Sequence, residues 1–338
     1  MDKNKIKIIA GAAVGVAILV AGGGYYHFHT STHSPEYALK TVEKTVSEHD
    51  KTNFYKVVDV DNLLNDSYDG LFEGLMESDD SITDETRDAV KNFTQMLKAP
   101  LILSLKNAID SYVETGNFQN ADNSGANELL ERTGIDKIEF RSVDNVTVNP
   151  ENENEAFADV KIFHPELGQE FIVQVVMKKN NDQWQVVLVQ NLQDFISQIH
   201  KMRRAKIDEY LTKSSEINFR HDNAVREAEQ KYGSILSIGS LGQSNTRSEL
   251  KTLMLDVLKK DWETRKQELF SLSVPKGAET LHNLRLKICD LEIGYAEDYA
   301  KWMEDKKAST IKAAEEKHHQ AQTLMVEAAA IARRMTNN

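Results

Sequence analysis

The chain has 338 residues, of which 41 are Lys or Arg and 53 are Asp or Glu, giving a formal net charge of −12. This balance argues against nucleic acid as a partner, because phosphate binding needs clustered basic side chains. The single cysteine, Cys289, excludes an intramolecular disulfide. The length predicts about two folded domains.

Residues 1–33 have the pattern of a membrane anchor. Three lysines precede an uncharged run at 8–26, and no Asp, Glu, Lys or Arg follows until Glu36. A run of this length is close to what an α-helix needs to cross a bilayer, and lysines are typical of the cytoplasmic side. We therefore expect a cytoplasmic tip, a single transmembrane helix that contacts the membrane through 8–26, and a short spacer.

Residues 35–338 are then expected to be extracytoplasmic, held at the cell membrane by one span with the N-terminus in the cytoplasm. The alternative is a cleaved signal peptide, since both patterns share a charged start and an apolar core. Either interpretation exports the same part of the chain.

The first exported domain is expected to span residues 34–196, and its first part is helical. The Ser-Pro-Glu sequence at 34–36 has the residue types of a helix start: a hydroxyl cap, a proline in the first turn and an acid near the positive end of the dipole. Apolar residues at helical spacing predict helices as far as Leu97, with a bend at Pro100, and a short helix at 125–132.

From residue 135 the apolar period changes to two, which predicts strands. The expected strands are 135–148, 156–163, 170–178 and 184–190. Helices followed by a run of antiparallel strands predict an α+β fold, with helices packed on one face of a curved antiparallel sheet.

Two stretches of this domain resemble known families. The start resembles an uncharacterised family of bacterial membrane-anchored domains, on the residues Ser34-Pro35-Glu36-Tyr37-Ala38-Leu39, Asp50, Phe54 and Val58-Asp59-Val60-Asp61. The end resembles the closing strand of nuclear-transport-factor-two-like domains, on the Gln-Trp-Gln-Val-Val-Leu-Val-Gln-Asn sequence at 183–191. The resemblance implies a cone-shaped α+β fold with a pocket between sheet and helices. Some members of that superfamily are enzymes that use an Asp and a His in the cone, but the motif places neither residue here.

Residues 197–338 are predicted to form an antiparallel helical bundle. A first helix is expected at 192–232 and is ended by Gly233, and a linker of small and polar residues follows at 234–245. The next helix is expected at 246–271, because its first four residues have the form of a capping box.

A break at Pro275 precedes the last helical stretch, which is expected at about 278–335. Its apolar residues recur at three- and four-residue steps, which is typical of helices packed in a bundle. Beyond Trp302 this seam weakens, so a break near 304–310 stays open beside one continuous helix.

Several groups of residues have the types found in functional sites, but each has a simpler interpretation. Three histidines follow the apolar run without a carboxylate or thiol to join them, and two adjacent histidines on a helix point in different directions. Two aspartates before a helix lack the glycine and the closing glutamate of a calcium loop. The residues concerned are His27, His29 and His33; His318 and His319; Asp59 and Asp61.

The remaining candidates are also read as structural. The acidic segment 77–80 is interpreted as a solvated loop, His164 as a turn residue and Cys289 as a small buried hydrophobe. Sequons at Asn65, Asn92 and Asn145 matter only in a host that glycosylates exported proteins. No catalytic, cofactor-binding or metal-ligating residue is assigned, and no cofactor is expected, because the motifs of phosphate loops, zinc proteases, nucleophile elbows and redox dithiols are missing from the sequence.

These observations favour a non-enzymatic protein of the bacterial cell envelope that binds a ligand or a protein, or acts as a scaffold. The bundle is expected to contact a protein partner or a second copy of the chain. The alternative is a small-molecule enzyme of the hydrolase or isomerase type with its site in the cone. An enzyme would need an inward-facing Asp, Glu or His of perturbed pKa, whereas a scaffold would have a filled cone and an exposed apolar stripe on a helix.

Overall fold

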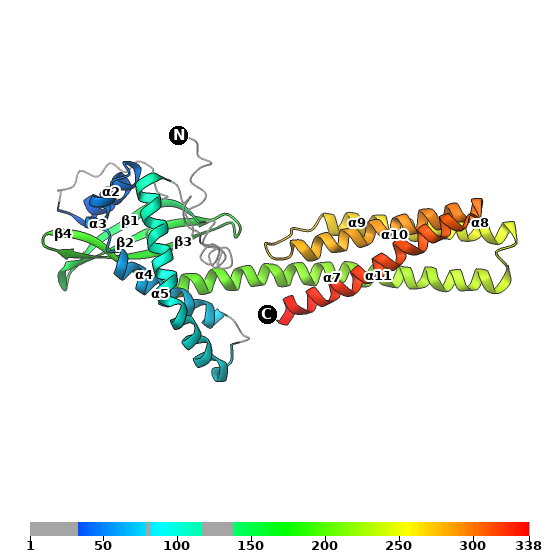
Figure 1. Cartoon of the computed structure of the whole chain (residues 1–338), viewed down its shortest axis with the longest axis horizontal. Coiled ribbons are helices and arrows are strands. Elements are labelled where there is room, and N and C mark those ends of the chain that lie inside the picture. Colours follow the sequence, from blue (N-terminus) through cyan, green and yellow to red (C-terminus); the bar gives the residue numbers. More distant parts are fainter. Residues whose placement is uncertain (1–32, 79–81, 117–137, 338) are drawn as a thin grey trace. The chain divides into compact units, whose positions relative to one another are not determined.

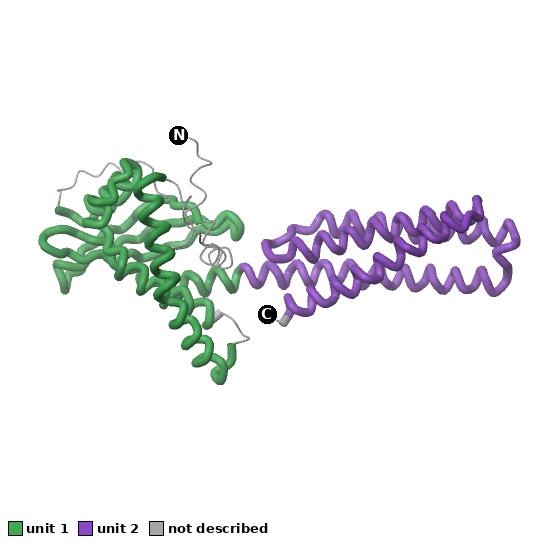
Figure 2. Tube along the Cα trace, in the orientation of Figure 1, with its two compact units in different colours: residues 1–202 green, residues 203–338 purple. Residues whose placement is uncertain are grey.

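The structure, a computed structural model, describes residues 33–78, 82–116 and 138–337. The chain divides into two compact units, residues 1–202 and 203–338, which Figure 2 shows in different colours. Each unit has its own hydrophobic core. The division falls inside a helix, α7 (Leu192–Ile238), whose first two turns contribute to the core of the first unit.

Unit 1 begins with four helices, which Figure 1 labels. They are α2 (Pro35–Ser47), α3 (Lys51–Val57), α4 (Val60–Ser78) and α5 (Asp84–Thr115). The start of α2 follows from its sequence, because the Ser34 hydroxyl accepts the backbone N–H of Tyr37 at 3.2 Å. The Asp50 carboxylate caps α3 in the same way, by accepting the N–H of Asn53 at 3.0 Å.

A four-stranded antiparallel sheet follows, with its strands in the order β1-β2-β3-β4. The strands are β1 (Glu139–Asn149), β2 (Asn152–His164), β3 (Gln169–Asn180) and β4 (Gln183–Val189). On β2 every second side chain is buried, from Ala156 to Ile162, so one face of the sheet meets the helices. The tight turn between β3 and β4 uses Asn181 and Asp182 at positive φ, which these residue types tolerate.

Three contacts fix the helices of unit 1 to its sheet and to α7. The Asp59 N–H donates to the Val186 carbonyl at 2.9 Å, where α4 begins, and the Trp184 indole N–H donates to the His33 carbonyl at 3.1 Å. Helix α4 also packs closely on the start of α7, because a Cβ at Gly74 would lie 2.6 Å from the Gln193 carbonyl oxygen.

Unit 2 is helical in its described residues. It contains the rest of α7, then α8 (Ser244–Thr252), η3 (Leu253–Lys259), α9 (Lys260–Phe270), α10 (Glu279–Asp305) and α11 (Ala308–Asn337). The segment η3 is a π-helix that joins α8 to α9 without a loop. Figure 1 shows these helices running alternately up and down the unit, as an antiparallel bundle.

The predicted fold class needs correction. It joined the α+β domain and the bundle to an N-terminal transmembrane helix, but no helix in residues 33–78, 82–116 and 138–337 combines the length and the apolar character that a membrane crossing requires. The described chain is instead mostly helical, with one four-stranded antiparallel sheet. The segment 8–26, on which the span was predicted, lies outside the described residues, as does the short helix expected at 125–132.

Two helices continue past residues that were expected to bend or end them. Helix α5 runs through Pro100, whose missing N–H removes only the bond to the carbonyl of Met96, on a turn that faces solvent. Helix α7 runs through Gly233 to Ile238, because a glycine costs only about 1 kcal/mol in a helix and Ile235 packs on the core beyond it.

The last helical stretch is divided into two antiparallel helices. Helix α10 ends at Asp305, and Lys306 adopts a left-handed conformation with a φ of 54°. The Asp305 carboxylate accepts the N–H of Lys307 at 2.9 Å and the hydroxyl of Thr310 at 2.8 Å. These bonds close the turn and start α11, so the weakening of the seam after Trp302 marks a reversal of the chain.

Candidate functional site

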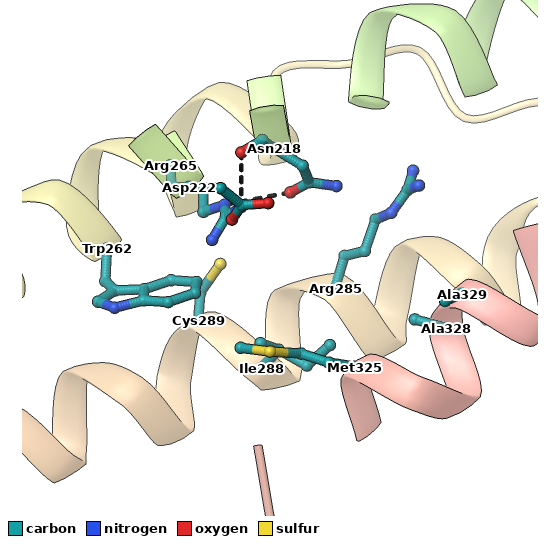
Figure 3. Close-up of a pocket in the computed structure, with 10 residues that line it drawn as sticks. All are labelled: Asn218, Asp222, Trp262, Arg265, Arg285, Ile288, Cys289, Met325, Ala328 and Ala329. Carbon is teal, nitrogen blue, oxygen red and sulfur yellow. Dashed lines mark hydrogen bonds and ion pairs between the residues drawn. The ribbon is translucent and has the colours of Figure 1, made fainter. Parts of the chain in front are cut away.

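Helices α7, α9, α10 and α11 line a cavity in unit 2, which we call the bundle cavity. Its volume is about 260 Å³, and Figure 3 shows the ten residues that line it. Apart from Arg285, the lining residues of α10 and α11 are apolar, with Ile288 and Met325 among them, whereas α7 contributes Asn218 and Asp222. Spaces between the helices of a bundle are common ligand sites.

Arg265 connects α9 to α7 at one side of the bundle cavity. Its side chain is 5% exposed, and its guanidinium donates to the Asn218 side chain at 3.1 Å and to the Asn218 carbonyl at 2.9 Å. It forms an ion pair with Asp222 and lies 4.4 Å from the centroid of the Trp262 ring. These contacts satisfy the charge, so we interpret Arg265 as a structural cross-link.

Arg285, on α10, lines the same cavity but has no carboxylate partner among the described residues. It is 8% exposed, its guanidinium donates to the Ser214 hydroxyl, and it lies 5.8 Å from the Tyr210 ring centroid. Removing a cation from water costs several kcal/mol, which a counter-charge normally offsets. The only lining carboxylate, Asp222, has a side chain that is 57% exposed and pairs with Arg265. The bundle cavity therefore has an excess of positive charge.

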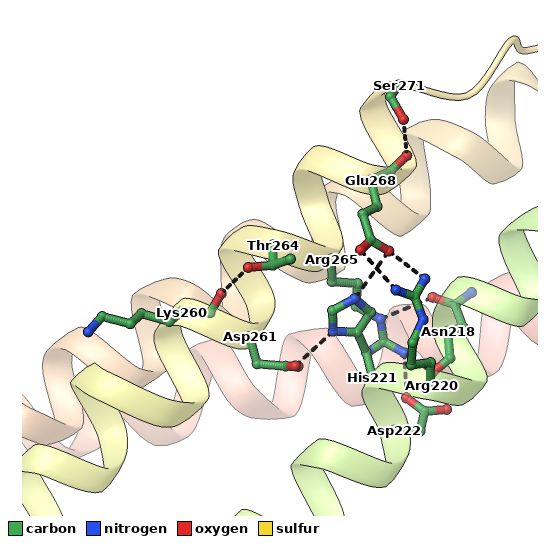
Figure 4. Close-up of polar contacts among 10 residues, drawn as sticks. All are labelled: Asn218, Arg220, His221, Asp222, Lys260, Asp261, Thr264, Arg265, Glu268 and Ser271. Atoms are coloured by element: carbon green, nitrogen blue, oxygen red, sulfur yellow. Dashed lines mark hydrogen bonds and ion pairs between the residues drawn. The ribbon is translucent and has the colours of Figure 1, made fainter.

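A polar network extends from the cavity along α7 and α9, as Figure 4 shows. Arg220 makes two bonds to Glu268, at 3.0 and 2.7 Å, and the ring nitrogens of His221 face Asp261 at 2.7 Å and Glu268 at 3.4 Å. Burial opposes ionisation of Glu268, but its bonds from Arg220 and His221 outweigh that effect and lower its pKa. Here the Arg220 guanidinium faces a carboxylate, in contrast to that of Arg285.

Cys289 forms part of the apolar wall of the bundle cavity. It is 1% exposed, and burial raises the pKa of its thiol to about 12, against an opposing effect of the Arg265 charge. The thiolate is the reactive form of cysteine, so the protonated thiol of Cys289 is not a nucleophile at neutral pH.

A histidine–carboxylate pair joins α11 to α10. The Glu292 side chain is 4% exposed, and its oxygens lie 3.0 and 3.2 Å from Nδ1 of His318. The bond to Glu292 raises the pKa of His318; burial opposes this shift, and the negative charges of Glu292 and Glu229 add to it.

This pair predicts a pH dependence of stability. Because the folded state raises the His318 pKa above its ordinary 6.5, it binds the proton more tightly than the unfolded state does. The resulting stabilisation is fully present below pH 6.5 and is lost as the pH rises through the folded-state pKa. We therefore expect the stability difference between the wild type and His318→Gln to shrink as the pH rises.

Denaturant unfolding of the full chain between about pH 5.5 and 8.5, where a histidine changes its charge, would measure this difference. The matched control is His319→Gln, because His319 is exposed on the same helix. A difference for His318→Gln that depends on pH no more than that of this control would contradict the assignment.

Unit 1 presents a surface groove and a packed inner sheet face. The groove, of about 670 Å³, is lined by polar groups such as Asn62 and Lys178 and by apolar side chains such as Phe157 and Leu188. The inner face is apolar and packs against the helices. The buried polar side chains that the structure describes in this unit are Thr45, Ser67, Thr94, His164 and Ser197, and none is a carboxylate.

The structure does not bring the residues considered from the sequence together in one site. Asp59 accepts the N–H of Asn62 at the start of α4, and Asp61 pairs with Lys106. His164 ends β2, where its carbonyl accepts N–H groups of the following turn. His27 and His29 lie outside the described residues, and within those residues no three His, Cys, Asp or Glu side chains are placed to hold a metal ion.

Sequence reasoning missed Arg265, Arg285 and Glu292, the three most deeply buried charges of the bundle. The sequence does carry a signal for Arg285 and Glu292. Arg285 lies four residues after Leu281, and Glu292 lies four after Ile288, so both occupy positions of the apolar face of α10. Charged residues at such positions indicate a polar interior.

Comparison of the chain with protein-family models, curated proteins and solved structures gives no match. The resemblance to nuclear-transport-factor-two-like domains therefore stays a prediction.

Proposed function

We propose that this chain is a non-enzymatic binding protein whose bundle cavity holds a small organic anion. The observation that carries the proposal is Arg285, a buried residue of the cavity lining that has no carboxylate partner among the described residues. An anionic ligand would supply the missing counter-charge, and a guanidinium can bind a carboxylate or phosphate group with two parallel hydrogen bonds.

The other walls suggest the rest of the ligand. Ile288, Met325 and Ala328 form an apolar surface opposite the polar residues of α7, which suits a hydrocarbon body behind the anionic head. The volume, about 260 Å³, is slightly below the roughly 300 Å³ at which pockets for drug-sized ligands begin. We therefore expect a short-chain amphipathic anion.

An enzymatic role in the cone-shaped domain has less support. That alternative required an inward-facing acid or histidine of perturbed pKa, and the inner sheet face of unit 1 is lined by apolar side chains, with His164 buried at the end of β2 and no buried carboxylate among the described residues of the unit. In the bundle cavity the only thiol, Cys289, is held in its unreactive form. These observations favour binding without chemistry.

Replacing Arg285 with methionine tests the proposal. We expect octanoate, a short amphipathic carboxylate, to bind the wild-type chain and to bind Arg285→Met at least about tenfold more weakly, which corresponds to 1.4 kcal/mol. In the absence of ligand the variant should be more stable than the wild type, by about 1–3 kcal/mol, because a buried charge is replaced by an apolar side chain. Ser214 keeps its bond to the Tyr210 carbonyl at 2.6 Å, so no hydroxyl is left unsatisfied.

Calorimetric titration would measure the affinity, and denaturant unfolding would measure the stability. Lys287→Met is the matched control, because it removes the same charge from an exposed position on the same helix. Octanamide, the uncharged analogue, should bind poorly. Equal octanoate affinity in the wild type and Arg285→Met would refute the proposal.

A protein contact is a second candidate function, favoured by helix α5. Phe93, Met96 and Leu103 lie on one side of this helix and are 57%, 71% and 60% exposed. Together with the packed inner sheet face, this exposed apolar stripe is what a scaffold was expected to show.

The expected extracytoplasmic location rests on residues outside the described part of the chain and stays a prediction.

A further inference from the structure

A second, smaller cavity lies further along the bundle. Its volume is about 140 Å³, and it is lined by residues of α7, η3, α9, α10 and α11. We call it the aromatic cavity, because Tyr232, Trp262 and Tyr295 contribute ring surface to its wall. It shares Trp262 with the bundle cavity but is otherwise lined by different residues.

Two carboxylates, those of Glu229 and Glu292, line the aromatic cavity, and the only basic side chain in its lining is that of His318. The Glu292 side chain is only 4% exposed, and in the part of the chain that the structure describes its hydrogen bonds come from His318 alone. A neutral His318 would leave that buried carboxylate without a counter-charge.

Two contacts hold the aromatic groups in place. The Tyr295 ring stacks on His318 with a centroid separation of 4.7 Å, and the Tyr232 hydroxyl lies 2.5 Å from that of Tyr299. Burial raises the pKa of Tyr295 to about 12, and the nearby Tyr232 and glutamates add to the shift. Neutral aromatic faces carry negative partial charge and attract cations.

The remaining wall is apolar and includes the π-helix. Met254 and Leu258 of η3 line the cavity beside Val225 and Ala228 of α7. π-Helical turns are rare and are frequently found at functional sites. A bare metal ion would need several oxygen or nitrogen ligands, whereas a cation surrounded by methyl groups can use aromatic and apolar surfaces.

We propose that the aromatic cavity binds a small methylated ammonium cation, with the aromatic rings around its methyl groups and Glu292 as the principal counter-charge. The site does not depend on the anion proposed for the bundle cavity. Either ligand can bind without the other, and the two proposals fail separately.

The test compares choline with 3,3-dimethylbutanol, its uncharged analogue of nearly the same shape. Titration of the full chain, followed by calorimetry and by tryptophan fluorescence, should show binding of choline and little or no binding of the alcohol. Equal binding of both would show a merely apolar cavity and would overturn the proposal, as would no saturable binding of choline. This comparison uses the wild-type chain and does not depend on any variant folding.

Variants then locate the site. Glu292→Gln keeps the size of the side chain and should weaken choline binding at least about tenfold. Glu327→Gln is the control, because Glu327 is exposed on α11 and outside the cavity lining. Octanoate binding should be unchanged in Glu292→Gln, which separates this result from a general loss of the bundle. Unchanged choline affinity in Glu292→Gln would contradict the assignment to the aromatic cavity.

Discussion

Replacing Trp262 with alanine should lower the free energy of unfolding of the bundle by about 3–5 kcal/mol, the usual cost of deleting a large buried aromatic side chain. Trp262 is 4% exposed and belongs to the core of unit 2. Its ring also lies against the Arg265 guanidinium, which would lose that contact. The indole stands between the two cavities, since it lines both, and its removal should join them.

Denaturant unfolding of the full chain, combined with amide hydrogen exchange in α9 and α10, would measure the loss. Trp262→Phe is the matched variant and should recover most of the stability, because a ring remains against Arg265. Affinity for both octanoate and choline should fall in Trp262→Ala. A loss below about 1 kcal/mol, which is ordinary for surface substitutions, would mean that the indole is not a packed part of the core.

Two glycines one turn apart on α4 should respond in opposite directions to alanine. A Cβ at Gly74 would lie 2.6 Å from the Gln193 carbonyl oxygen and 3.1 Å from the Ile196 Cβ, so the helices must separate. Overpacking of this kind costs about 1–3 kcal/mol. At Gly70 the nearest atoms are 3.6 Å away, which is ordinary contact. There alanine should stabilise the helix, by about 0.5–1 kcal/mol, through its higher helix propensity.

Thermal or denaturant unfolding of the two single variants tests the pair, each serving as the control of the other. Gly74→Ala should unfold earlier than the wild type and Gly70→Ala later. If both variants were stabilised, α4 and α7 would not approach as closely as the structure places them.

The sheet was the most predictable part of the fold. Each of the four expected strands overlaps an observed one. Alternation of apolar and polar residues, as from Ala156 to Ile162, indicates a strand in a sheet with one buried face. The residues at which the strands begin and end were less predictable. Residues 152–154, for example, are exposed and give no apolar signal, yet they belong to β2, which begins at the pairing of Asn152 with Asn149.

Helix ends were harder to predict than helices, because local breakers compete with tertiary packing. Gly233 was expected to end α7, but the chain turns only at Gly239, where a Cβ would lie 2.2 Å from the Thr246 hydroxyl oxygen. The difference comes from Ile235 and Leu236, which pack on residues far along the chain.

The candidate sites could not be predicted, since they depend on which charges meet across four helices. Arg265 and Arg285 are twenty residues apart on different helices, and only the packed bundle shows that one has a carboxylate partner and the other does not. A charged residue on an apolar helix face is a usable signal, but it does not reveal the sign or identity of its neighbours.

The π-helix has a consequence for how the sequence of this segment should be aligned. Leu250, Met254, Leu258 and Trp262 are all buried, at steps of four residues. In an α-helix each such step turns by about 40° beyond a full circle, so three steps would carry the last side chain about 120° away from the first. The wider turns of η3 absorb this drift and keep the four residues facing the interior. Related chains that lack one residue within 253–259 would restore an ordinary helix, so a one-residue gap in this segment would mark the loss of the π-helix and of its part in the aromatic wall.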